Sequence, residues 1–465
     1  MGIFGAMTTA VSGLKSQSYA MENISGNIAN SRTTGFKRVD TNFVDLIPDR
    51  PAGQELGGSV QGRSLATNTI QGDLNTTGVA ENVAINGEGF FVVRESTGFA
   101  GGQPTFGGID VYTRRGDFNR DNNGYLVNGA GYFLKGIPLD PATGALVGSN
   151  PQLIKINRNN IAPKETANIE YAAQLPSLPL TNYQVQTSSQ TNPANGLVTA
   201  GAAYAGGANP ATITGAESSV FIDRSIAGGS VNIFNQQGAS KPINLRWGKI
   251  ANASTVGPVL EQWNLYYQND STAAGAATAW TKIGGTISFD AAGLPTPALT
   301  AVPLPAFTLD GTPYNALSLN MANLTSNPPN DINGNRSTAK VTIMSPDGYA
   351  TGEFISTSID QSGRVVGNYS NGQVVGLAQI VLARFNAANA LKRGDGGIFA
   401  ATLESGQPII DQAGSNVQGG TVENSNTDIA DEFAKMIVTQ QAYSANTRVI
   451  STSSDMLRDV INIIR

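Results

Sequence analysis

The stretch "NIANSRTTGFKR", from Asn27 to Arg38, lies where a helical start of the chain gives way to a different pattern. Its basic residues, hydroxyls and glycine suit either a phosphate cradle or a connector. A phosphate cradle needs a glycine-rich turn after a strand and before a helix, so that several backbone amides converge on the anion. Here the helical pattern comes first, and the residues from Asn30 to Gly35 favour turns and helix exits. The stretch is therefore predicted to end a helix, with Lys37 and Arg38 as solvated or interface charges.

Before this stretch, apolar residues recur at alternating steps of three and four. This spacing places them on one stripe of a helix and is typical of a coiled-coil strand. The stripe consists of Phe4, Met7, Val11, Leu14, Met21 and Ile28, with Ser18 and Ser25 as polar exceptions.

The same alternation returns from Asn426 to Arg465, a segment with neither glycine nor proline. Its forty residues are enough for a helix about 60 Å long. Ser425 and Asp428 resemble a capping box, which predicts that the helix starts there. One heptad register is apolar throughout and consists of Ile429, Met436, Tyr443, Ile450, Leu457 and Ile464. A second register contains Phe433 and Ile461 at its ends and the polar residues Gln440, Thr447 and Ser454 at its centre.

Neither terminal helix can bury such a seam by itself, so each needs a partner. Two arrangements satisfy this need. In one, the helices pair within the chain and close one domain. In the other, the seams face neighbouring copies of the chain, and the periodicity alone does not distinguish the two.

Composition excludes several classes of function. The chain has no cysteine and no histidine, which removes thiolate nucleophiles, imidazole bases and the common soft metal ligands. Its formal net charge is −5, so it offers no basic field for nucleic acid. It has no apolar run long enough to span a bilayer. Its start carries no basic residue before Lys15, and we expect export without a cleaved signal peptide. No cofactor is expected.

The middle of the chain reads as β-structure. Asn-Gly pairs at Asn86-Gly87, Asn123-Gly124 and Asn128-Gly129 are hairpin signals. The 46 residues from Tyr171 to Ala216 carry no charge, but strand-like runs at Ser230–Asn235 and Asn264–Gln268 argue for a loose β-domain. We expect a mainly β protein with helical termini that form a coiled-coil-like pole, and β-rich domains nested as successive insertions. The expected parts are an N-terminal helix (1–35), a connector (36–70), a first β-rich domain in two pieces (71–154 and 342–424), an inserted outer β-domain (155–341) and a C-terminal helix (425–465).

Three apparent sites of chemistry are weak. "NGEGFF" around Gly87 lacks the third glycine of a dinucleotide fingerprint and precedes a strand, which favours a hairpin. Asn119, Asp121 and Asn123 copy the first half of a calcium loop, but Ala130 stands at its twelfth position, which favours a tight turn. A glycosidase requires a pair of carboxylates, and the sequence singles out no such pair. No catalytic, cofactor-binding or metal-binding residue is therefore predicted.

Several long motifs nevertheless resemble one family in the same order along the chain. "SGNIANSRTTGFKRVDTNF" is similar to the N-terminal signature of the flagellar axial proteins, which are the rod, hook and junction subunits. "QGDLNTTGVAENVAINGEGFFVV" and "YTRRGDFNRDNNGYLVNGAGYFLKG" resemble the first outer domain of that family. "VENSNTDIADEFAKMIVTQQAYSANTRVISTSSDML" resembles its C-terminal signature. The first motif carries Asn27, Ala29, Asn30, Thr33, Gly35, Phe36, Lys37 and Arg38.

Within the family, the segment from Ser345 to Phe385 resembles the hook members, above all at "YSNGQ". The length of the chain agrees, since rod members lack so large a central insertion. Ala390 and Gly397 depart from the residues usual at those places, which are Gly and Asn.

The resemblance implies a structural subunit of a tubular polymer, with the terminal helices innermost around an export channel and the β-domains outward. It further implies a place outside the cell in the flagellar hook. The implied partners are further copies of the chain, the rod and hook-filament junction proteins, the hook cap and the type III export apparatus. Gln440, Thr447 and Ser454 then either set the register between helices or face the channel.

Two other interpretations stay open. A distal rod or junction subunit shares the terminal motifs but is stiff, and a rod subunit lacks the large insertion. A β-rich surface adhesin belongs to another class and does not need matched helical seams at both ends.

Overall fold

The computed structural model describes residues 3–46, 59–187, 193–199, 204–253, 260–326, 338–411 and 416–463. The chain divides into two compact units. The first comprises residues 1–159, 354–369 and 374–465, and the second comprises residues 160–353 and 370–373. The predicted fold class is confirmed, because the described chain is mainly β-structure with a long helix at each end.

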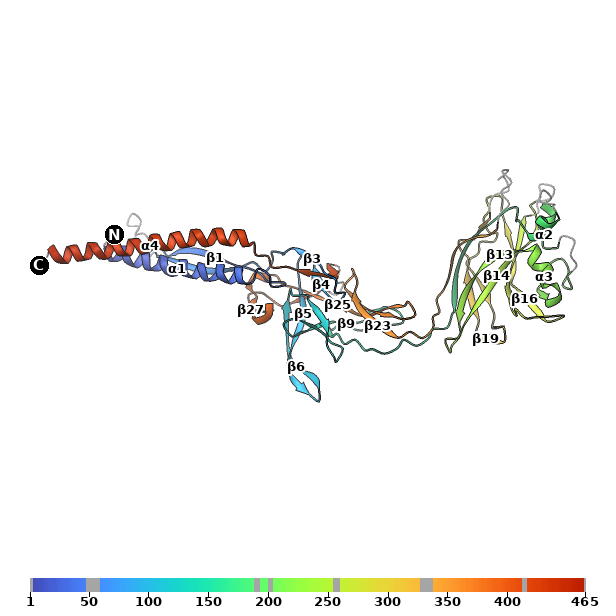
Figure 1. Cartoon of the computed structure of the whole chain (residues 1–465), viewed down its shortest axis with the longest axis horizontal. Helices are drawn as coiled ribbons and strands as arrows, with labels where there is room; N and C mark the ends of the chain where they lie inside the picture. The colour runs from blue at the N-terminus through green and yellow to red at the C-terminus, as the bar shows by residue number, and fades with distance from the viewer. Residues whose placement is uncertain are drawn as a thin grey trace. The chain divides into compact units, whose positions relative to one another are not determined.

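The terminal helices are α1 (Ile3–Ala29) and α4 (Ile429–Ile463), and they pack side by side in the first unit (Figure 1). The end of α1 agrees with the prediction that the motif beginning at Asn27 terminates a helix. The predicted start of α4 was wrong. Oδ1 of Asp428 accepts hydrogen bonds from the amides of Ala430 and Asp431, at 2.8 and 3.3 Å, so Asp428 caps the helix. The hydroxyl of Ser425 instead accepts from the amide of Thr427, outside the helix.

The largest sheet of the first unit follows the order β23-β24-β25-β9-β5-β6-β28-β27, with its pairs antiparallel. These strands are β23 (Phe354–Ile359), β24 (Arg364–Tyr369), β25 (Val374–Ile380), β9 (Tyr132–Pro138), β5 (Phe90–Ala100), β6 (Gln103–Thr113), β28 (Ile398–Ala400) and β27 (Lys392–Gly394). Shorter strands join it at its sides, namely β7 (Phe118–Arg120), β8 (Leu126–Asn128), β10 (Gln152–Leu153), β26 (Leu382–Arg384) and β29 (Ile409–Asp411).

Three small sheets complete the first unit, and two of them join segments far apart in sequence. β1 (Val39–Leu46) pairs with β2 (Ser59–Ala66) as a hairpin against α1. β3 (Leu74–Thr76) pairs with β31 (Thr421–Glu423), and β4 (Val83–Ile85) pairs with β30 (Val417–Gly419). The two later pairs bring the segment after the connector against the segment that leads into α4.

The hairpin predictions hold at two of the three Asn-Gly pairs. Asn123-Gly124 joins β7 to β8, and Asn128-Gly129 joins β8 to β9. Oδ1 of Asp121 accepts from the backbone amides of Asn123 and Tyr125, which confirms the predicted tight turn. Asn86-Gly87 makes no hairpin, because β4 pairs with β30 and not with the strand that follows it.

The second unit carries a mixed sheet and an antiparallel sheet. The mixed sheet has β11 (Asn168–Leu175) between β20 (Leu317–Asn320) and β22 (Lys340–Pro346), with β17 (Ala301–Leu304) beside β20 and β21 (Thr325–Ser326) on β11. The antiparallel sheet follows the order β12 (Thr212–Thr214), β16 (Thr278–Phe289), β15 (Glu261–Gln268), β14 (Ser240–Ala251) and β13 (Ile226–Phe234). β18 (Phe307–Leu309) and β19 (Thr312–Tyr314) form a hairpin, and α2 (Asn182–Gln186) and α3 (Gly215–Arg224) are short helices.

Both units have apolar cores formed by their sheets. Phe91, Phe118 and Leu134 are fully buried in the first unit, and Trp247 and Trp263 are buried in the second. The helical pair has no comparable core, since Ala10, Ala20 and Ile24 are the buried apolar residues that α1 contributes within its described length. The second unit begins and ends at residues 160 and 353, whereas the sequence placed the inserted domain at 155–341. The finer six-part division of the chain stays a prediction.

Candidate functional site

The terminal helices meet along small and polar side chains. Gly13 of α1 lies so close to Asn446 of α4 that a Cβ at position 13 would be 2.9 Å from the amide of Asn446. Among the described residues of α4, the fully buried ones are Glu432, Thr439 and Ser453. These three and Asn446 repeat every seven residues, so the helix turns a polar heptad stripe toward the interior.

Asn27 ties the two helices to β1. Its side-chain nitrogen donates to Oε2 of Glu432 at 2.9 Å and to the carbonyl of Val39 at 3.0 Å, and its oxygen accepts from the amide of Val39 at 2.8 Å. Lys435 then bridges Oε1 of Glu432 at 2.8 Å and Oδ1 of Asp40 at 3.0 Å. One amide side chain thus fixes the exit of α1, the first turn of α4 and the start of β1.

A second polar stripe on α1 holds the β1–β2 hairpin. The hydroxyls of Ser12 and Ser16 donate to the carbonyl of Val60, at 2.5 and 2.9 Å, and accept from the amides of Val60 and Gly62 at 3.1 Å each. Further along the same face, Tyr19 bonds Ser64 and Asn23 bonds Thr41. The stripe consists of Ser12, Ser16, Tyr19, Asn23 and Asn27, which follow helical spacing. That spacing is a sequence signal, but polar side chains carry it, so it does not contribute to the apolar periodicity of the helix.

The predicted apolar seam lies beside these stripes, and none of its described residues is fully buried. On α1, Met7, Leu14, Met21 and Ile28 are half-buried, whereas Phe4 and Val11 are exposed. On α4, Met436, Ile450 and Leu457 are half-buried, whereas Ile429, Phe433, Tyr443 and Ile461 are exposed. Ile464 lies outside the described residues. Of the polar positions in the second register, Gln440 and Thr447 are exposed and Ser454 is half-buried.

The helices therefore pair within the chain, while the seam is only partly covered and none of its described residues is fully buried. The expected contact of the seam with neighbouring copies remains a prediction, because the structure contains a single chain.

The motif that begins at Asn27 forms a compact turn after α1. Ala29 ends the helix, and the amide of Asn30 donates to the carbonyl of Gly26 at 3.2 Å. The hydroxyl of Thr33 donates to Oδ1 of Asn30 at 3.1 Å. Arg38 is half-buried, and its amide donates to Oδ1 of Asn426 at 2.7 Å, which connects the motif to the segment before α4.

Gly35 is required at its position for two reasons. Its φ is +67°, a left-handed conformation that residues with a side chain adopt at a cost. A Cβ there would also lie 2.7 Å from the backbone carbon of Arg114 and from the amide nitrogen of Arg115. The amide of Gly35 donates to the carbonyl of Glu423 at 2.7 Å. The turn thus lets the N-terminal motif touch the backbone of both the β-domain and the C-terminal segment.

Lys37 is buried, which corrects the expectation of a solvated or interface charge. Its ammonium lies 2.5 Å from Oε1 of Glu423, and it also donates to the carbonyl of Ile70 at 2.5 Å. Arg114 reaches the other oxygen of the same carboxylate at 3.2 Å and donates to the carbonyl of Gly87 at 2.6 Å. The expectation failed because the counter-ion stands 386 residues later in the chain, beyond the reach of any local pattern.

The three charges of this cluster, Lys37, Arg114 and Glu423, are almost wholly shielded from solvent. Burial lowers the pKa of Lys37, Glu423 opposes that shift and the charge of Arg114 adds to it. Burial likewise lowers the pKa of Arg114 against the opposing effect of Glu423. A carboxylate held by two cations in a dry interior is costly to disturb, since removal of one partner leaves the others uncompensated. The cluster fixes the relation of the helical pair to the β-domain.

Phe36 makes a further contact between the motif and the sheet. The guanidinium of Arg393 lies 5.4 Å from the ring of Phe36 and 5.8 Å from the ring of Phe399, within the range of a cation–π interaction. Arg393 also donates to the carbonyl of Lys37. This arginine joins β27 to the motif, and no local pattern in the sequence predicts the contact.

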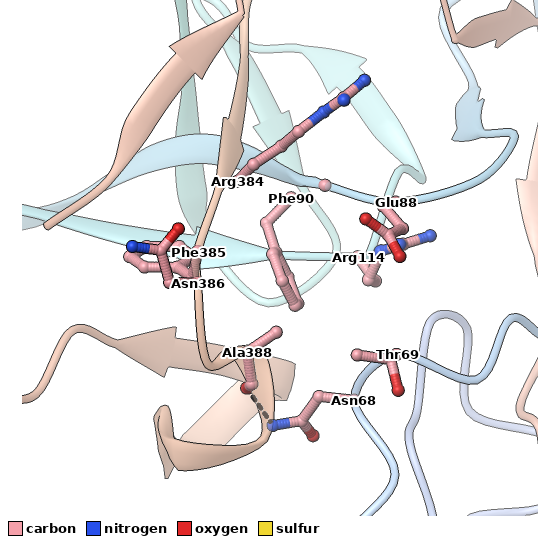
Figure 2. A pocket seen from close by; sticks show the side chains of 10 residues that line it. Asn68, Thr69, Glu88, Phe90, Arg114, Arg384, Phe385, Asn386 and Ala388 are labelled. Atoms are coloured by element: carbon pink, nitrogen blue, oxygen red, sulfur yellow. Dashed lines mark hydrogen bonds between the residues drawn. The ribbon is translucent and has the colours of Figure 1, made fainter. Parts of the chain in front are cut away.

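Arg114 also lines a small pocket of about 130 Å³ (Figure 2). It is bordered by Asn68, by Phe90 at the start of β5 and by the loop after β26. The side chain of Asn68 donates to the carbonyl of Ala388 at 2.9 Å, which closes one wall. Of the described residues that line it, Glu88 alone carries a carboxylate. This pocket therefore offers no carboxylate pair of the kind that glycoside hydrolysis needs.

Within the described ranges, no group of three or more acidic residues is placed so as to hold a metal ion. No helix in that part of the chain is long and apolar enough to cross a membrane.

Comparison with family models matches three segments of the chain. Residues 7–37 match the flagella basal body rod protein, residues 84–170 match the D1 domain of the flagellar hook protein FlgE/F/G, and residues 418–463 match the C-terminal region of the flagellar basal body rod FlgEFG protein. Full-length relatives agree. The flagellar hook protein FlgE of Salmonella typhimurium is 29% identical over 466 residues, which are 98% of this chain and 100% of the relative. Over its whole length, this chain is similar to the flagellar rod and hook proteins.

Other flagellar hook proteins match at similar levels. The flagellar hook protein FlgE of Brucella suis is 28% identical over all of both chains, and that of Treponema pallidum is 29% identical over 99% of each. Among solved structures, the flagellar hook protein FlgE2 of Helicobacter pylori shares 14% identity, with a TM-score of 0.46 over 75% of this chain and 99% of the other.

Each of the three family segments supplies one member of the buried charge cluster. Lys37 ends the first segment, Arg114 lies in the second and Glu423 lies in the third. The three parts of the chain that carry the family signature thus converge on a single carboxylate.

Proposed function

We propose that this chain is the structural subunit of the bacterial flagellar hook. It polymerises into a flexible tubular joint that passes torque from the rod to the filament. The full-length relatives named above are hook proteins, and this chain covers their whole length.

One observation carries the polymer mechanism, namely that α4 has no fully buried apolar side chain among its described residues. Phe433, Val438 and Ile461 are 50, 64 and 63% exposed. Exposed apolar surface costs roughly 25 cal/mol per Å². A helix of this length with so much exposed apolar surface therefore gains much of its stability from a partner outside the chain. Neighbouring copies supply that partner when the seam residues of α1 and α4 pack against them.

A helical polymer follows from the kind of interface. When each copy contacts the next through two different patches, the copies form a ring only if the rotation between successive copies closes. Otherwise they form an open helical filament. A hook bends as it rotates. The β-rich parts of neighbouring copies therefore have to move relative to one another, while the helices at the centre of the polymer stay packed together.

The chain acts as a building block and not as an enzyme. Its partners are further copies, the rod below, the junction proteins above, the cap at the growing end and the type III export apparatus that delivers it. The polymer lies outside the cell.

Electron microscopy of flagellar basal structures from cells that lack this chain tests the function. We expect an intact rod and no curved segment. A truncated rod would identify a rod subunit instead, and complete flagella would contradict any axial role. Cells that regain the chain from a plasmid serve as the control and should regain the curved segment.

A further inference from the structure

The hairpin of β5 and β6 extends past the sheet that carries it (Figure 1). Up to Glu95, β5 also pairs with β9, but from Ser96 to Ala100 it pairs with β6 alone. β6 meets β28 only at Tyr112 and Thr113. The part from Ser96 to Ile109 is therefore an arm with no neighbouring strand in its own chain, within the described residues.

The arm is held in place from its inner side. The ring of Phe106 packs edge-on against Phe133 and Tyr125, with centroids 4.9 and 5.6 Å apart. The side-chain nitrogen of Gln103 donates to Oδ1 of Asn123 at 2.9 Å, and the side-chain nitrogen of Asn123 donates to the carbonyl of Gly102 at 3.2 Å. An element fixed in this way loses little conformational freedom when it binds.

Large apolar side chains nevertheless point into solvent from this arm. Phe99 is 73% exposed and Ile109 is 79% exposed. The whole arm from Ser96 to Ile109 carries no charged residue. A rigid, uncharged arm with an open phenyl ring near its tip is suited to insertion into an apolar recess.

A recess lined by aromatic rings and by charged side chains lies elsewhere on the same unit. It has a volume of about 370 Å³ between the motif that begins at Asn27 and the loop from Gly394 to Gly397. Phe36, Ile398 and the buried Phe399 supply its apolar lining, whereas Lys37, Arg115, Arg393 and Asp395 supply its charged lining. The guanidinium of Arg393 lies over two of these rings, so a third ring placed there meets both aromatic edges and a cation.

We infer that Phe99 of one copy docks into this recess of a neighbouring copy in the polymer. The arm of the same chain does not fill the recess, because Phe99 is not part of its lining and stays exposed. A second copy is the occupant because polymerisation brings identical chains together, and a contact between two different patches is the head-to-tail kind that builds filaments. The inference rests on the proposed function and adds a contact of the β-domain to those of the helices.

Cysteine cross-linking tests this contact, since the native chain has no cysteine. The variant Phe99→Cys with Asp395→Cys places one thiol on the arm and one at the rim of the recess, where Asp395 is exposed. Mild oxidation of the assembled polymer should give a ladder of covalent multimers. The pair Phe99→Cys with Leu403→Cys is the control, because Leu403 is fully exposed and lies outside the recess, and it should give no ladder.

A second measurement does not depend on thiols. Phe99→Ala should raise the concentration at which the chain assembles by about tenfold, whereas Leu403→Ala should leave it unchanged. Polymers that form normally, give no ladder with the first pair and assemble at the same concentration with Phe99→Ala would overturn the inference. A wild-type chain that forms no polymer would overturn the proposed function instead.

Discussion

The ammonium of Lys37 lies 2.5 Å from Oε1 of Glu423, and neither side chain has any exposed surface. The same carboxylate receives Arg114 at 3.2 Å and the amide of Gly72 at 2.9 Å. A single side chain thus accepts hydrogen bonds from the N-terminal motif, from the backbone just before β3 and from Arg114 of the β-domain. In a chain whose helices have little apolar core of their own, such a cluster determines how the helices attach to the sheet.

Glu423→Gln should destabilise the first unit by about 3–5 kcal/mol, because two buried cations lose their counter-ion. Urea unfolding followed by circular dichroism measures the change. Glu404→Gln is the matched control, since Glu404 is exposed, and it should stay within about 0.5 kcal/mol of the wild type. Equal stability of the two variants would mean that the cluster contributes nothing to the attachment of the helices.

Gly35→Ala should destabilise the same unit through the backbone. The positive φ alone costs about 1–3 kcal/mol, and the Cβ adds a clash 2.7 Å from the backbone of Arg114. Gly78→Ala provides the comparison, because Gly78 has no atom within 4 Å of its would-be Cβ and is not among the residues with positive φ. Thermal unfolding of both variants should show a lower Tm for Gly35→Ala alone.

The sequence was sufficient for what depends on local pattern. Periodicity predicted both terminal helices, and the turn chemistry of Asn123-Gly124 and Asn128-Gly129 predicted their hairpins. It failed at Asn86-Gly87, where the pairing partner of β4 is the distant β30. Local turn propensity does not reveal a partner so far along the chain.

The same limit explains the candidate site. Apolar spacing predicts a seam on each helix, but it does not show which stripe of one terminal helix packs against the other terminal helix. On α4 that stripe is polar, at Glu432, Thr439 and Ser453, and polar residues read as solvent-facing until their partners are known. The burial of Lys37 was not predicted for the same reason, because its partner Glu423 lies far away in the sequence.

Ser16→Ala should loosen the β1–β2 hairpin without unfolding the helices. The change removes a hydrogen bond to the carbonyl of Val60 and one from the amide of Gly62, each worth about 1 kcal/mol. Hydrogen exchange of the amides of β2 should become faster. Ser18→Ala changes the same residue type on an exposed face of the same helix, and it should leave that exchange as in the wild type.

Glu217 predicts a pH dependence in the second unit. The pKa of Glu217 is lowered from 4.5, chiefly because the backbone amide of Thr214 donates to its carboxylate. Burial opposes this shift, and a second hydrogen bond from the backbone amide of Ala205 adds to it. A carboxyl whose pKa is lower in the folded state stabilises the fold fully above pH 4.5, its value when unfolded. That stabilisation is lost as pH falls through the lower, folded pKa.

Glu217→Gln should therefore lower the Tm of the second unit at pH 7 and have a smaller effect at pH 2 to 3. Thermal unfolding of both forms across this range measures the difference. Glu353→Gln is the control, because the described contacts include no pair of backbone donors to the carboxylate of Glu353. A difference between wild type and Glu217→Gln that is constant with pH would show that the carboxylate acts through its shape alone.

Leu457→Asp tests the seam itself. Leu457 belongs to the apolar register of α4 and is half-buried in the single chain, far in sequence from the β-rich cores. A charge there should prevent incorporation into the polymer, because an unpaired carboxylate in a packed helical interface is strongly unfavourable. Sedimentation of assembled material measures incorporation, and near-UV circular dichroism of the tryptophans buried in the second unit reports whether that β-domain stays folded. Leu403→Asp, on a fully exposed loop residue, should assemble normally. If Leu457→Asp also assembles like the wild type, the open seam of α4 has no part in contacts between copies, and the polar stripe at Glu432, Thr439 and Ser453 is then the whole of its packing.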